Sequence, residues 1–219
     1  MPAPTPPKRP VVAGRLVFLR PLEPDDFELV HRWYEDAEFL ALMGGRPVSL
    51  ASRRAFFEKQ AANPPDDVAN FVVCLLEDGR PIGRVDLFDI DPWNGSAAFG
   101  IGIGSVDDRG HGYGTDAVRA LCDYVFGQLR LERLWLTTDA DNRRAQHIYE
   151  SLGFRHESVA RHAYYQDGRY QDDVRMALLR GEWVALDRPK RGLRFDPMDP
   201  LANLAEAPDA QNAPAEPAR

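Results

Sequence analysis

The sequence predicts one α/β domain. Its 219 residues are enough for a single domain with a sizeable core. Segments with the pattern of strands alternate with segments that have the pattern of amphipathic helices. In the middle of the chain, a glycine-dense turn joins an apolar strand to such a helix. Hydrophobic residues make up 44 % and charged residues 28 %, as is ordinary for a soluble globular protein.

The two ends of the chain differ from the middle. Residues 1–12 form a proline-rich lead, which suits neither helix nor sheet. Residues 187–219 are rich in proline, alanine and polar residues and have no periodicity, so we expect a disordered tail there. The folded domain is therefore expected at residues 13–186.

The first half of this domain predicts a strand, two helices and a hairpin. Pro24, Asp25 and Asp26 suit the first turn of a helix, because proline needs no N–H partner there and acids favour the positive end of the helix dipole. Asp78-Gly79 is a turn typical of a β-hairpin. The expected ranges are a strand at 14–19, a helix from 24 to about 34, a helix from Ser49 to about 62, and hairpin strands at 71–76 and 82–88.

The second half predicts a buried central strand, a helix, a further strand and helix, and a closing hairpin. The run at 97–104 is small and apolar, as in a buried strand. Gly153 is placed to end a helix as its C-terminal cap. The expected ranges after the central strand are a helix carrying Ala117 to Val125, a strand at 133–138, a helix at 142–152, and hairpin strands at 154–164 and 173–179.

The glycine-dense turn spans residues 109–115, Arg-Gly-His-Gly-Tyr-Gly-Thr. A strand that turns sharply into a helix directs the unpaired N–H groups of the first helical turn at one point, where the helix dipole favours an anion. Glycines leave room for a phosphate and permit positive φ. A tight turn that binds nothing would explain these glycines about as well as a phosphate-binding turn would. The turn lacks the lysine of a P-loop and the spacing of the dinucleotide-binding fingerprint.

The spacing Arg-x-x-Gly-x-Gly resembles the central motif of the GCN5-related N-acetyltransferases. Residues 141–154 resemble the family's second signature, a helix with the pattern Asn-x-x-Ala-x-x-x-Tyr-x-x-x-Gly-Phe. The similarity runs from about Gly14 to Trp183, and points to the branch of ribosomal-protein alanine acetyltransferases and spermidine acetyltransferases. It implies a single mixed, mostly antiparallel twisted sheet of about seven strands, flanked by helices.

The resemblance implies direct transfer of an acetyl group from acetyl-CoA to a primary amine, which is a protein N-terminal alanine or serine, a polyamine or another small amine. In this family a splayed central strand offers its amides to the pantetheine arm, and the glycine turn holds the pyrophosphate. Arg143 and Arg144 are either further phosphate ligands or solvated surface charges. The implied cofactor-binding residues are Gly102, Ile103, Gly104, Arg109, Gly110, His111, Gly112, Tyr113, Gly114, Thr115, Asn142, Ala145 and Tyr149.

Tyr149 is the expected catalytic residue, as proton donor to the departing thiolate. It shares a helix face with Ala145 and Leu152, a pattern that by itself favours a core tyrosine. The resemblance implies instead that its hydroxyl points at the thioester sulfur, and a phenol, neutral at pH 7, suits that role. Asn142 has the type and position of a helix N-cap, and its counterpart in the family also contacts the cofactor arm.

The general base is unassigned. Relatives often carry a glutamate in the central strand, where this chain has Ala98. A water chain is one substitute. The carboxylates available as substitutes by residue type are Asp86, Asp107, Asp172 and Asp173.

The acceptor is expected between the first two helices and the last hairpin. Aromatic walls and negative charge there would hold an ammonium by ion pairing or cation–π contact, although each residue taken singly is more often a packing residue. The candidates are Trp33, Tyr34, Phe39, Tyr164, Tyr165, Tyr170, Asp172 and Asp173.

The composition of the chain indicates which classes of binding partner are expected. The formal charge of 27 − 34 = −7 argues against a nucleic-acid-binding protein and agrees with a cationic substrate. No apolar run is long enough to span a membrane and no signal peptide is evident, so a cytoplasmic location is expected. Cys74 and Cys122 lie in apolar stretches as core residues, and no metal-ligand spacing is present. Dimers are frequent in the resembled family, so a homodimer is an open expectation.

Two other functions remain as alternatives. One is a catalytically inactive module that senses acyl-CoA or binds a partner; the missing strand glutamate favours it, and Tyr149 with Asn142 opposes it. The other is a dinucleotide-dependent oxidoreductase, which the mid-chain position of the glycine turn disfavours. Neither motif contains a cysteine, so a covalent cysteine relay is not expected.

Overall fold

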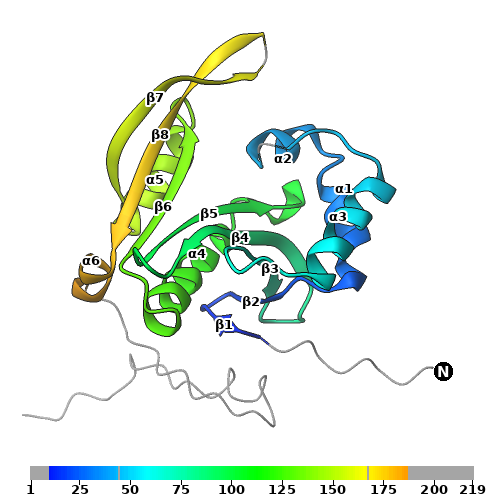
Figure 1. Cartoon of the computed structure of the whole chain (residues 1–219), viewed down its shortest axis with the longest axis horizontal. Helices are drawn as coiled ribbons and strands as arrows, with labels where there is room; N and C mark the ends of the chain where they lie inside the picture. The colour runs from blue at the N-terminus through cyan, green and yellow to red at the C-terminus, as the bar shows by residue number, and fades with distance from the viewer. Residues whose placement is uncertain (1–9, 44, 167, 187–219) are drawn as a thin grey trace, which may run out of the picture. The chain divides into compact units, whose positions relative to one another are not determined.

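The computed structural model of the chain describes residues 10–43, 45–166 and 168–186. Its framework is an eight-stranded sheet with the order β1-β2-β3-β4-β5-β6-β8-β7 (Figure 1). Neighbouring strands run antiparallel except β5 and β6, which are parallel. The expected mixed, mostly antiparallel sheet flanked by helices is confirmed. The lead expected at 1–12 lies outside the described residues except for its last three, and the tail expected at 187–219 lies outside them entirely.

The elements follow the expected order, with additions. The strands are β1 (Val12–Ala13), β2 (Val17–Pro21), β3 (Ala69–Leu75), β4 (Pro81–Asp91), β5 (Ser96–Ile103), β6 (Arg133–Asp139), β7 (Arg155–Gln166) and β8 (Arg169–Leu179). The helices are α1 (Phe27–Trp33), α2 (Ala37–Leu42), α3 (Leu50–Ala62), α4 (Tyr113–Asp123), α5 (Arg143–Ser151) and α6 (Arg180–Ala185). Short 3-10 turns, η1 (Pro24–Asp26) and η2 (Val106–Asp108), precede α1 and α4, and a π-helical turn, η3 (Tyr124–Gln128), continues α4.

The two faces of the sheet have different roles. Because side chains alternate along a strand, one face of β4, β5 and β6 is apolar and packs against α4 and α5 in the main core. We call this the core face; it carries Val85, Leu87, Ala97, Phe99, Leu134 and Leu136. The opposite, outer face carries Arg84 and Asp86 on β4, Ala98, Gly100 and Gly102 on β5, Trp135, Thr137 and Asp139 on β6, and Asp173 and Arg175 on β8.

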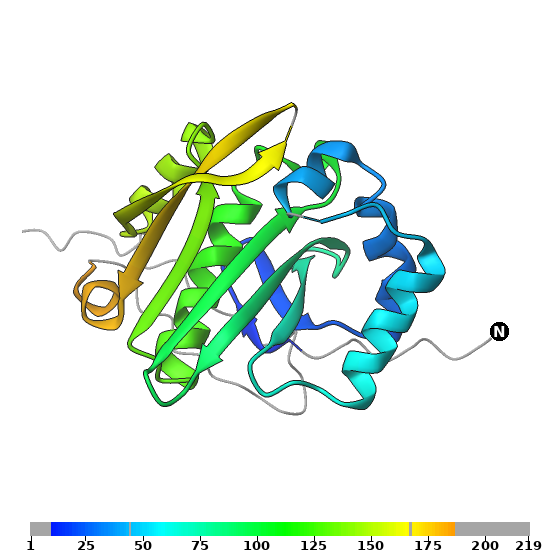
Figure 2. The ribbon, with the colours of Figure 1, turned by 45° about the horizontal axis from the view of Figure 1, so that its top comes forward.

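Strands β5 and β6 separate soon after they begin. They pair only at Ser96↔Arg133, Ala97↔Leu134 and Ala98↔Trp135. Beyond these positions β5 continues alongside β4, while β6 follows β8 as far as Asp139↔Asp173. The gap widens toward the carboxyl ends of the two strands, as Figure 2 shows. One edge of β5 therefore lacks a strand partner from Phe99 onward.

Several local signals predicted the ends of helices correctly. Ser49 Oγ accepts a hydrogen bond from Ser52 N at the start of α3, and Asn142 Oδ1 accepts one from Ala145 N, 3.0 Å away, at the start of α5. Gly153 ends α5 with φ of 96°, in the left-handed region. Cys74 and Cys122 are buried, as expected.

The structure corrects the expected strand at 14–19. Residues 14–17 form the tight turn between β1 and β2, closed by a 2.7 Å hydrogen bond from Gly14 N to Val17 O. A distant carboxylate holds this turn: Asp116 Oδ2 in α4 accepts from the backbone N–H groups of Arg15, Leu16 and Val17 at 2.7, 2.7 and 3.1 Å. The helices α2 and α6 were not expected either, because they are short and their packing is tertiary.

We predict that Asp116→Ala destabilises the fold by about 3 kcal/mol, because three backbone N–H groups lose their shared acceptor. Urea denaturation would measure the change. Asp107→Ala, at an exposed position just before the glycine turn, is the control and should change stability by less than about 0.5 kcal/mol. Equal effects of the two substitutions would contradict the assignment.

Candidate active site

The glycine turn lies between the end of β5 and the start of α4. Gly110 and Gly112 have φ of 85° and 83°, which other residues rarely adopt. The first helical hydrogen bond runs from Asp116 N to Gly112 O at 3.0 Å. In the described part of the chain, the N–H groups of residues 110–115 therefore donate to no backbone acceptor. They are free donors at the amino end of an eleven-residue helix, an arrangement that favours binding of an anion such as a diphosphate.

Arg144 adds a positive charge beside this turn. A β-carbon placed on Gly110 would lie 3.8 Å from Arg144 Nη2, so the guanidinium of α5 lies next to the turn. Arg144 forms no ion pair with any residue that the structure describes. Arg143 differs, because its Nη1 donates to Gln146 Oε1 on its own helix. Of the two arginines that sequence left open, Arg144 is the one placed to meet a phosphate.

Arg109 has partners other than a phosphate. Its Nε donates to Ile103 O at 3.1 Å, and its two terminal nitrogens bind Glu38 at 2.6 Å and Asp36 at 3.2 Å. These acids belong to α2 and its N-cap, so the guanidinium fastens α2 to the end of β5. The Arg109 side chain thus has partners within the protein, and the expected role of Arg109 in closing the turn around the cofactor stays a prediction.

Gly102 in β5 and Gly104 just after it leave space for two aromatic side chains against the backbone. A β-carbon on Gly102 would lie 2.6 Å from a ring carbon of Phe39, and one on Gly104 would lie 2.3 Å from Trp33. Phe39 and Trp33 are 0 % and 7 % exposed, so they belong to a core cluster under α1 and α2. The prediction that these two rings line an acceptor surface is wrong, because the strand glycines bury them.

Along β5, the backbone N–H groups point alternately toward β4 and toward the gap beside β6. Gly104 N donates to Ile82 O at 2.8 Å, so the even-numbered residues of this strand direct their N–H groups to β4. The N–H groups of Ile101 and Ile103 consequently face the gap beside β6. Ile103 is an expected cofactor ligand from the resemblance, and the same alternation makes Ile101 a further candidate that the sequence alone did not indicate, because the register of the strand was not known.

Tyr149 of α5 packs on the core face of the sheet, against β5. Its ring packs edge-to-face against Phe99 and Phe154 with centroids 5.9 Å apart in each case. Burial raises the pKa of the phenol to about 12. Its hydroxyl donates to no acceptor among the residues that the structure describes. The phenol is therefore neutral at ordinary pH and its ring is held by packing; that its hydroxyl meets a ligand in the gap stays a prediction.

Carboxylates gather on the outer face where β6 ends. Asp139 and Asp173 are register partners on β6 and β8, and Tyr164 Oη of β7 donates to Asp139 Oδ2 at 2.8 Å. Burial first, and the charge of Asp139 second, raise the pKa of Asp173, although a hydrogen bond from Thr137 opposes them. Burial first, and then the hydrogen bond to Asp139, likewise raise the pKa of Tyr164. Asp139 was missed from the sequence; its position at the end of a strand is the signal that could have found it.

The other expected acceptor residues are divided between two walls. Tyr165 and Tyr170 are 64 % and 60 % exposed near the tip of the β7–β8 hairpin, with rings 5.2 Å apart. The carboxylate of Asp172 accepts from His162 N within that hairpin, so it stabilises the hairpin itself. Tyr34 lies on the opposite wall below α2, with Arg53 stacked 3.8 Å from its ring centroid.

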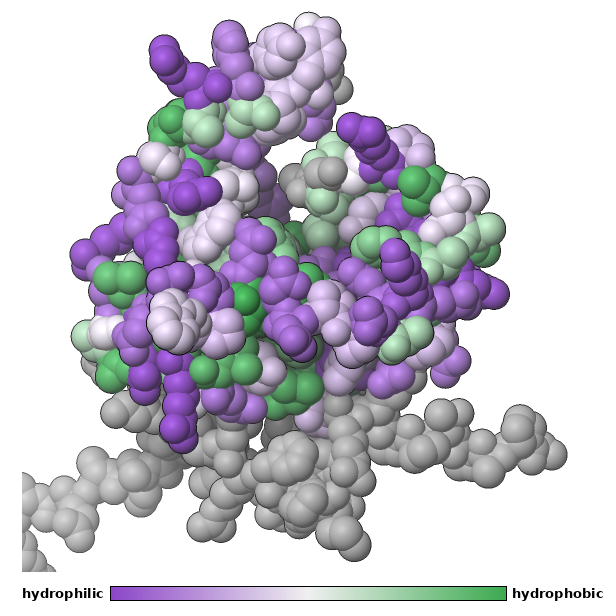
Figure 3. All heavy atoms as spheres, in the orientation of Figure 1, coloured by the Kyte–Doolittle hydropathy of each residue, from purple (hydrophilic) through white to green (hydrophobic). Residues whose placement is uncertain are grey.

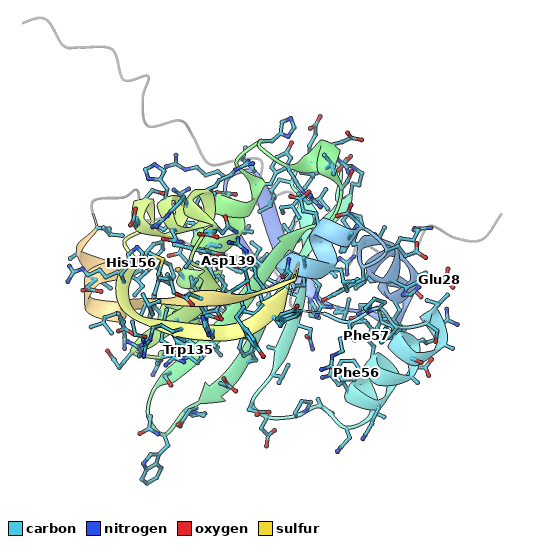
Figure 4. All side chains as sticks on the ribbon, turned by 90° about the horizontal axis from the view of Figure 1, so that it is seen from above. Glu28, Phe56, Phe57, Trp135, Asp139 and His156 are labelled. Atoms are coloured by element: carbon cyan, nitrogen blue, oxygen red, sulfur yellow. The ribbon has the colours of Figure 1, made fainter. Side chains whose placement is uncertain are left out.

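Figure 3 shows the surface hollowed between the β7–β8 hairpin and α2. The two walls can be followed in Figure 4, where Trp135 and Asp139 mark β6 and Phe57 marks α3. Among the described residues, no group of three or more His, Cys, Asp or Glu side chains could hold a metal ion. No helix of the described part is both long and apolar enough to span a bilayer.

Comparison with known proteins places this site in context. The profile of the acetyltransferase (GNAT) domain family matches residues 16–155. Spermidine N(1)-acetyltransferase of Escherichia coli K12 is 30 % identical over 169 residues, which cover 77 % of this chain and 89 % of that protein. A putative ribosomal N-acetyltransferase of Bacillus subtilis is 34 % identical over 109 residues, covering 50 % of this chain and 59 % of the relative.

The same similarity is found among solved structures. Spermidine N-acetyltransferase of Vibrio cholerae, in complex with CoA and spermine, superposes with a TM-score of 0.72 at 27 % identity. The superposition covers 77 % of this chain and 98 % of the Vibrio chain.

We predict that Arg144→Ala weakens the binding of coenzyme A about tenfold, because one charge-assisted contact with a phosphate is lost. Isothermal titration calorimetry with coenzyme A would measure it. Arg143→Ala removes the same charge from the neighbouring position and should change the affinity less than twofold. Equal losses would show that Arg144 acts only through net charge.

Proposed function

Because this chain belongs to the GNAT acetyltransferase family and moves an acetyl group from acetyl-CoA to an amine, we propose that its acceptor is a small polycationic amine of the polyamine class. The observation that carries the proposal is the pair Asp139 and Asp173 on the outer face beside the gap. Two carboxylates next to each other repel, and the pKa of Asp173 is raised by burial first and by this repulsion second. A bound ammonium group would relieve it.

The surroundings of this pair suit a long cation. Tyr164 contributes a ring and a hydroxyl bonded to Asp139, and the exposed rings of Tyr165 and Tyr170 lie farther along the same hairpin. Aromatic faces attract ammonium groups by cation–π interaction. The net charge of −7 also favours approach of a polycation. The similarity to spermidine acetyltransferases of two bacteria supports the same class of acceptor.

The proposed division of labour within the site follows the gap. The N–H groups of residues 110–115 and Arg144 hold the diphosphate of acetyl-CoA, while the backbone N–H groups of Ile101 and Ile103 bind its pantetheine arm. Tyr149, on the core side, donates its proton to the departing thiolate. Asn142 contributes by fixing the first turn of α5 and hence the position of Tyr149. A homodimer and a cytoplasmic location stay predictions.

If the chain were an inactive acyl-CoA sensor, the hydroxyl of Tyr149 would have no catalytic role. A sensor needs the donors of residues 110–115 but has no use for an unpartnered phenol at the end of the gap. Release of free thiol from acetyl-CoA, measured with and without an amine, separates the two functions. Binding of acetyl-CoA with no amine-dependent thiol release would favour the sensor.

We predict that Tyr149→Phe lowers kcat about 100-fold, because general acid catalysis contributes about 100-fold or more. The dissociation constant of acetyl-CoA should change less than twofold, since the ring and its packing remain. With the pKa at about 12, the phenol stays protonated below that pH, so its ionisation should cause no fall in kcat across an ordinary assay range. Steady-state kinetics and calorimetry would test both, and an unchanged kcat would remove Tyr149 from the mechanism.

We predict that, in a panel of spermidine, spermine, amino acids and ribosomal N-terminal peptides, the polyamines have the highest kcat/KM. Asp173→Asn should raise the KM for spermidine about tenfold, because the proposed ammonium partner is lost. A carboxylate with a raised pKa becomes neutral first as the pH falls, so the wild-type KM should rise as the pH drops through that pKa. A preference for peptides would contradict the proposal.

A further inference from the structure

Asp86 places a carboxylate on the outer face close to the gap. It lies on β4, and its register partner on β5 is Gly100. A β-carbon on Gly100 would meet only the edge of Phe88, at 3.8 Å, so the strand leaves open space beside Asp86. The next pair on the same face of these two strands is Phe88↔Ala98. Ala98 is the position where relatives often have a glutamate, and Asp86 places a carboxylate on the same face of the neighbouring strand.

Only one of the two carboxylate oxygens of Asp86 forms a hydrogen bond with the described residues. Oδ1 accepts a 2.5 Å hydrogen bond from Arg84 Nη2, while Oδ2 has no partner among the residues that the structure describes. The Asp86 side chain is 16 % exposed. A purely structural ion pair between neighbours on one strand would not require this second oxygen to stay accessible.

The charged and titratable groups around Asp86 come from three elements. Arg84 lies on the same strand and also binds Asn70 Oδ1 of β3. Tyr34 at the end of α1 lies within 3.4 Å of Arg84 Nη1, and Arg53 of α3 stacks on the Tyr34 ring. Burial raises the pKa of Asp86, and the charge and hydrogen bond of Arg84 oppose the rise without cancelling it. A carboxylate shifted in this direction is a stronger base than an exposed one.

We propose that Asp86 is the general base that takes the proton from the acceptor ammonium. The ammonium gives one proton to Asp86 Oδ2, and the amine then attacks the thioester carbonyl carbon, forming the C–N bond as the C–S bond breaks. The thiolate takes the Tyr149 proton, the second proton of the nitrogen returns to the phenolate through water, and Asp86 releases its proton to solvent. The inference rests on amine acetylation but not on which amine is the acceptor.

The two proton-transferring groups then stand on opposite faces of the sheet. Tyr149 packs on Phe99 of the core face, whereas Asp86 belongs to the outer face. A thioester held in the gap between β5 and β6 would meet the acid from one side and the incoming amine from the other. This arrangement keeps Tyr149 from protonating the amine and Asp86 from meeting the thiolate.

The test compares Asp86→Asn with Asp89→Asn, an exposed position on the same strand that serves as control. Any amine of the panel that the wild type acetylates is used, so a non-polyamine acceptor would refute the acceptor proposal and leave this test intact. At neutral pH, Asp86→Asn should lower kcat/KM for the amine about 100-fold, with an unchanged dissociation constant for acetyl-CoA. Asp89→Asn should change neither.

General-base catalysis by Asp86 also predicts how the loss of activity depends on pH and on the pKa of the amine. An amine that is already neutral in solution needs no base, so the loss in Asp86→Asn should shrink as the pH approaches the pKa of the amine. The loss should also shrink for acceptors of low pKa, such as aminoacetonitrile. A loss of the same size at every pH and for every amine would overturn the proposal, because a structural role predicts that result.

A second variant decides the case in which Asp86→Asn does not fold. Asp86→Glu retains a carboxylate that pairs with Arg84, and far-ultraviolet circular dichroism with acetyl-CoA titration establishes whether it folds. Folded Asp86→Glu should keep the pH dependence of the wild type at a rate within about tenfold. Activity reduced more than 100-fold in a folded Asp86→Glu protein that binds acetyl-CoA, with no dependence on the pKa of the amine, would also overturn the proposal.

Discussion

The separation of β5 from β6 after the pair Ala98↔Trp135 is the constraint on which the site depends. Within a sheet, each inner strand satisfies its backbone groups on both sides, so a strand that loses one neighbour presents a row of free donors and acceptors. Here the loss occurs in the interior of the molecule. The free edge of β5 lies beside the amino end of α4, and Tyr149 of α5 packs on the same strand.

Packing around the gap explains why small residues line it. Because Gly102 and Gly104 have no side chains, the rings of Phe39 and Trp33 pack directly on the backbone there. Arg109 also links α2 to the end of β5 by ion pairs with Glu38 and Asp36. These contacts hold one wall of the hollow in place. The other wall, the β7–β8 hairpin, is joined to β6 by strand pairing and by the hydrogen bond from Tyr164 to Asp139. Each wall is thus fixed independently of any ligand, which lowers the entropic cost of binding one.

The charges of the site are divided along the gap. Unpaired N–H groups and Arg144 make the end near α4 electropositive, whereas Asp139 and Asp173 make the outer face electronegative near β6 and β8. Such a division orients a substrate pair in which one partner carries phosphates and the other carries ammonium groups. It also separates the proposed acid, Tyr149, from the proposed base, Asp86, so that one proton is taken and another is given without competition between them.

The sequence by itself determined the order of elements, the glycine turn, the N-caps at Ser49 and Asn142 and the acetyltransferase family, because each depends on residues within one short stretch. Only the tertiary structure decided which groups meet. The turn at 14–17 exists because Asp116, about a hundred residues away, accepts its N–H groups. Trp33 of α1 and Phe39 of α2 are buried because glycines at the end of β5 leave room for their rings, and Asp86 lies close to Ala98 because of the register between β4 and β5. Spacing along the chain reports local hydrogen bonding and helix periodicity, but it contains no distance between separate elements.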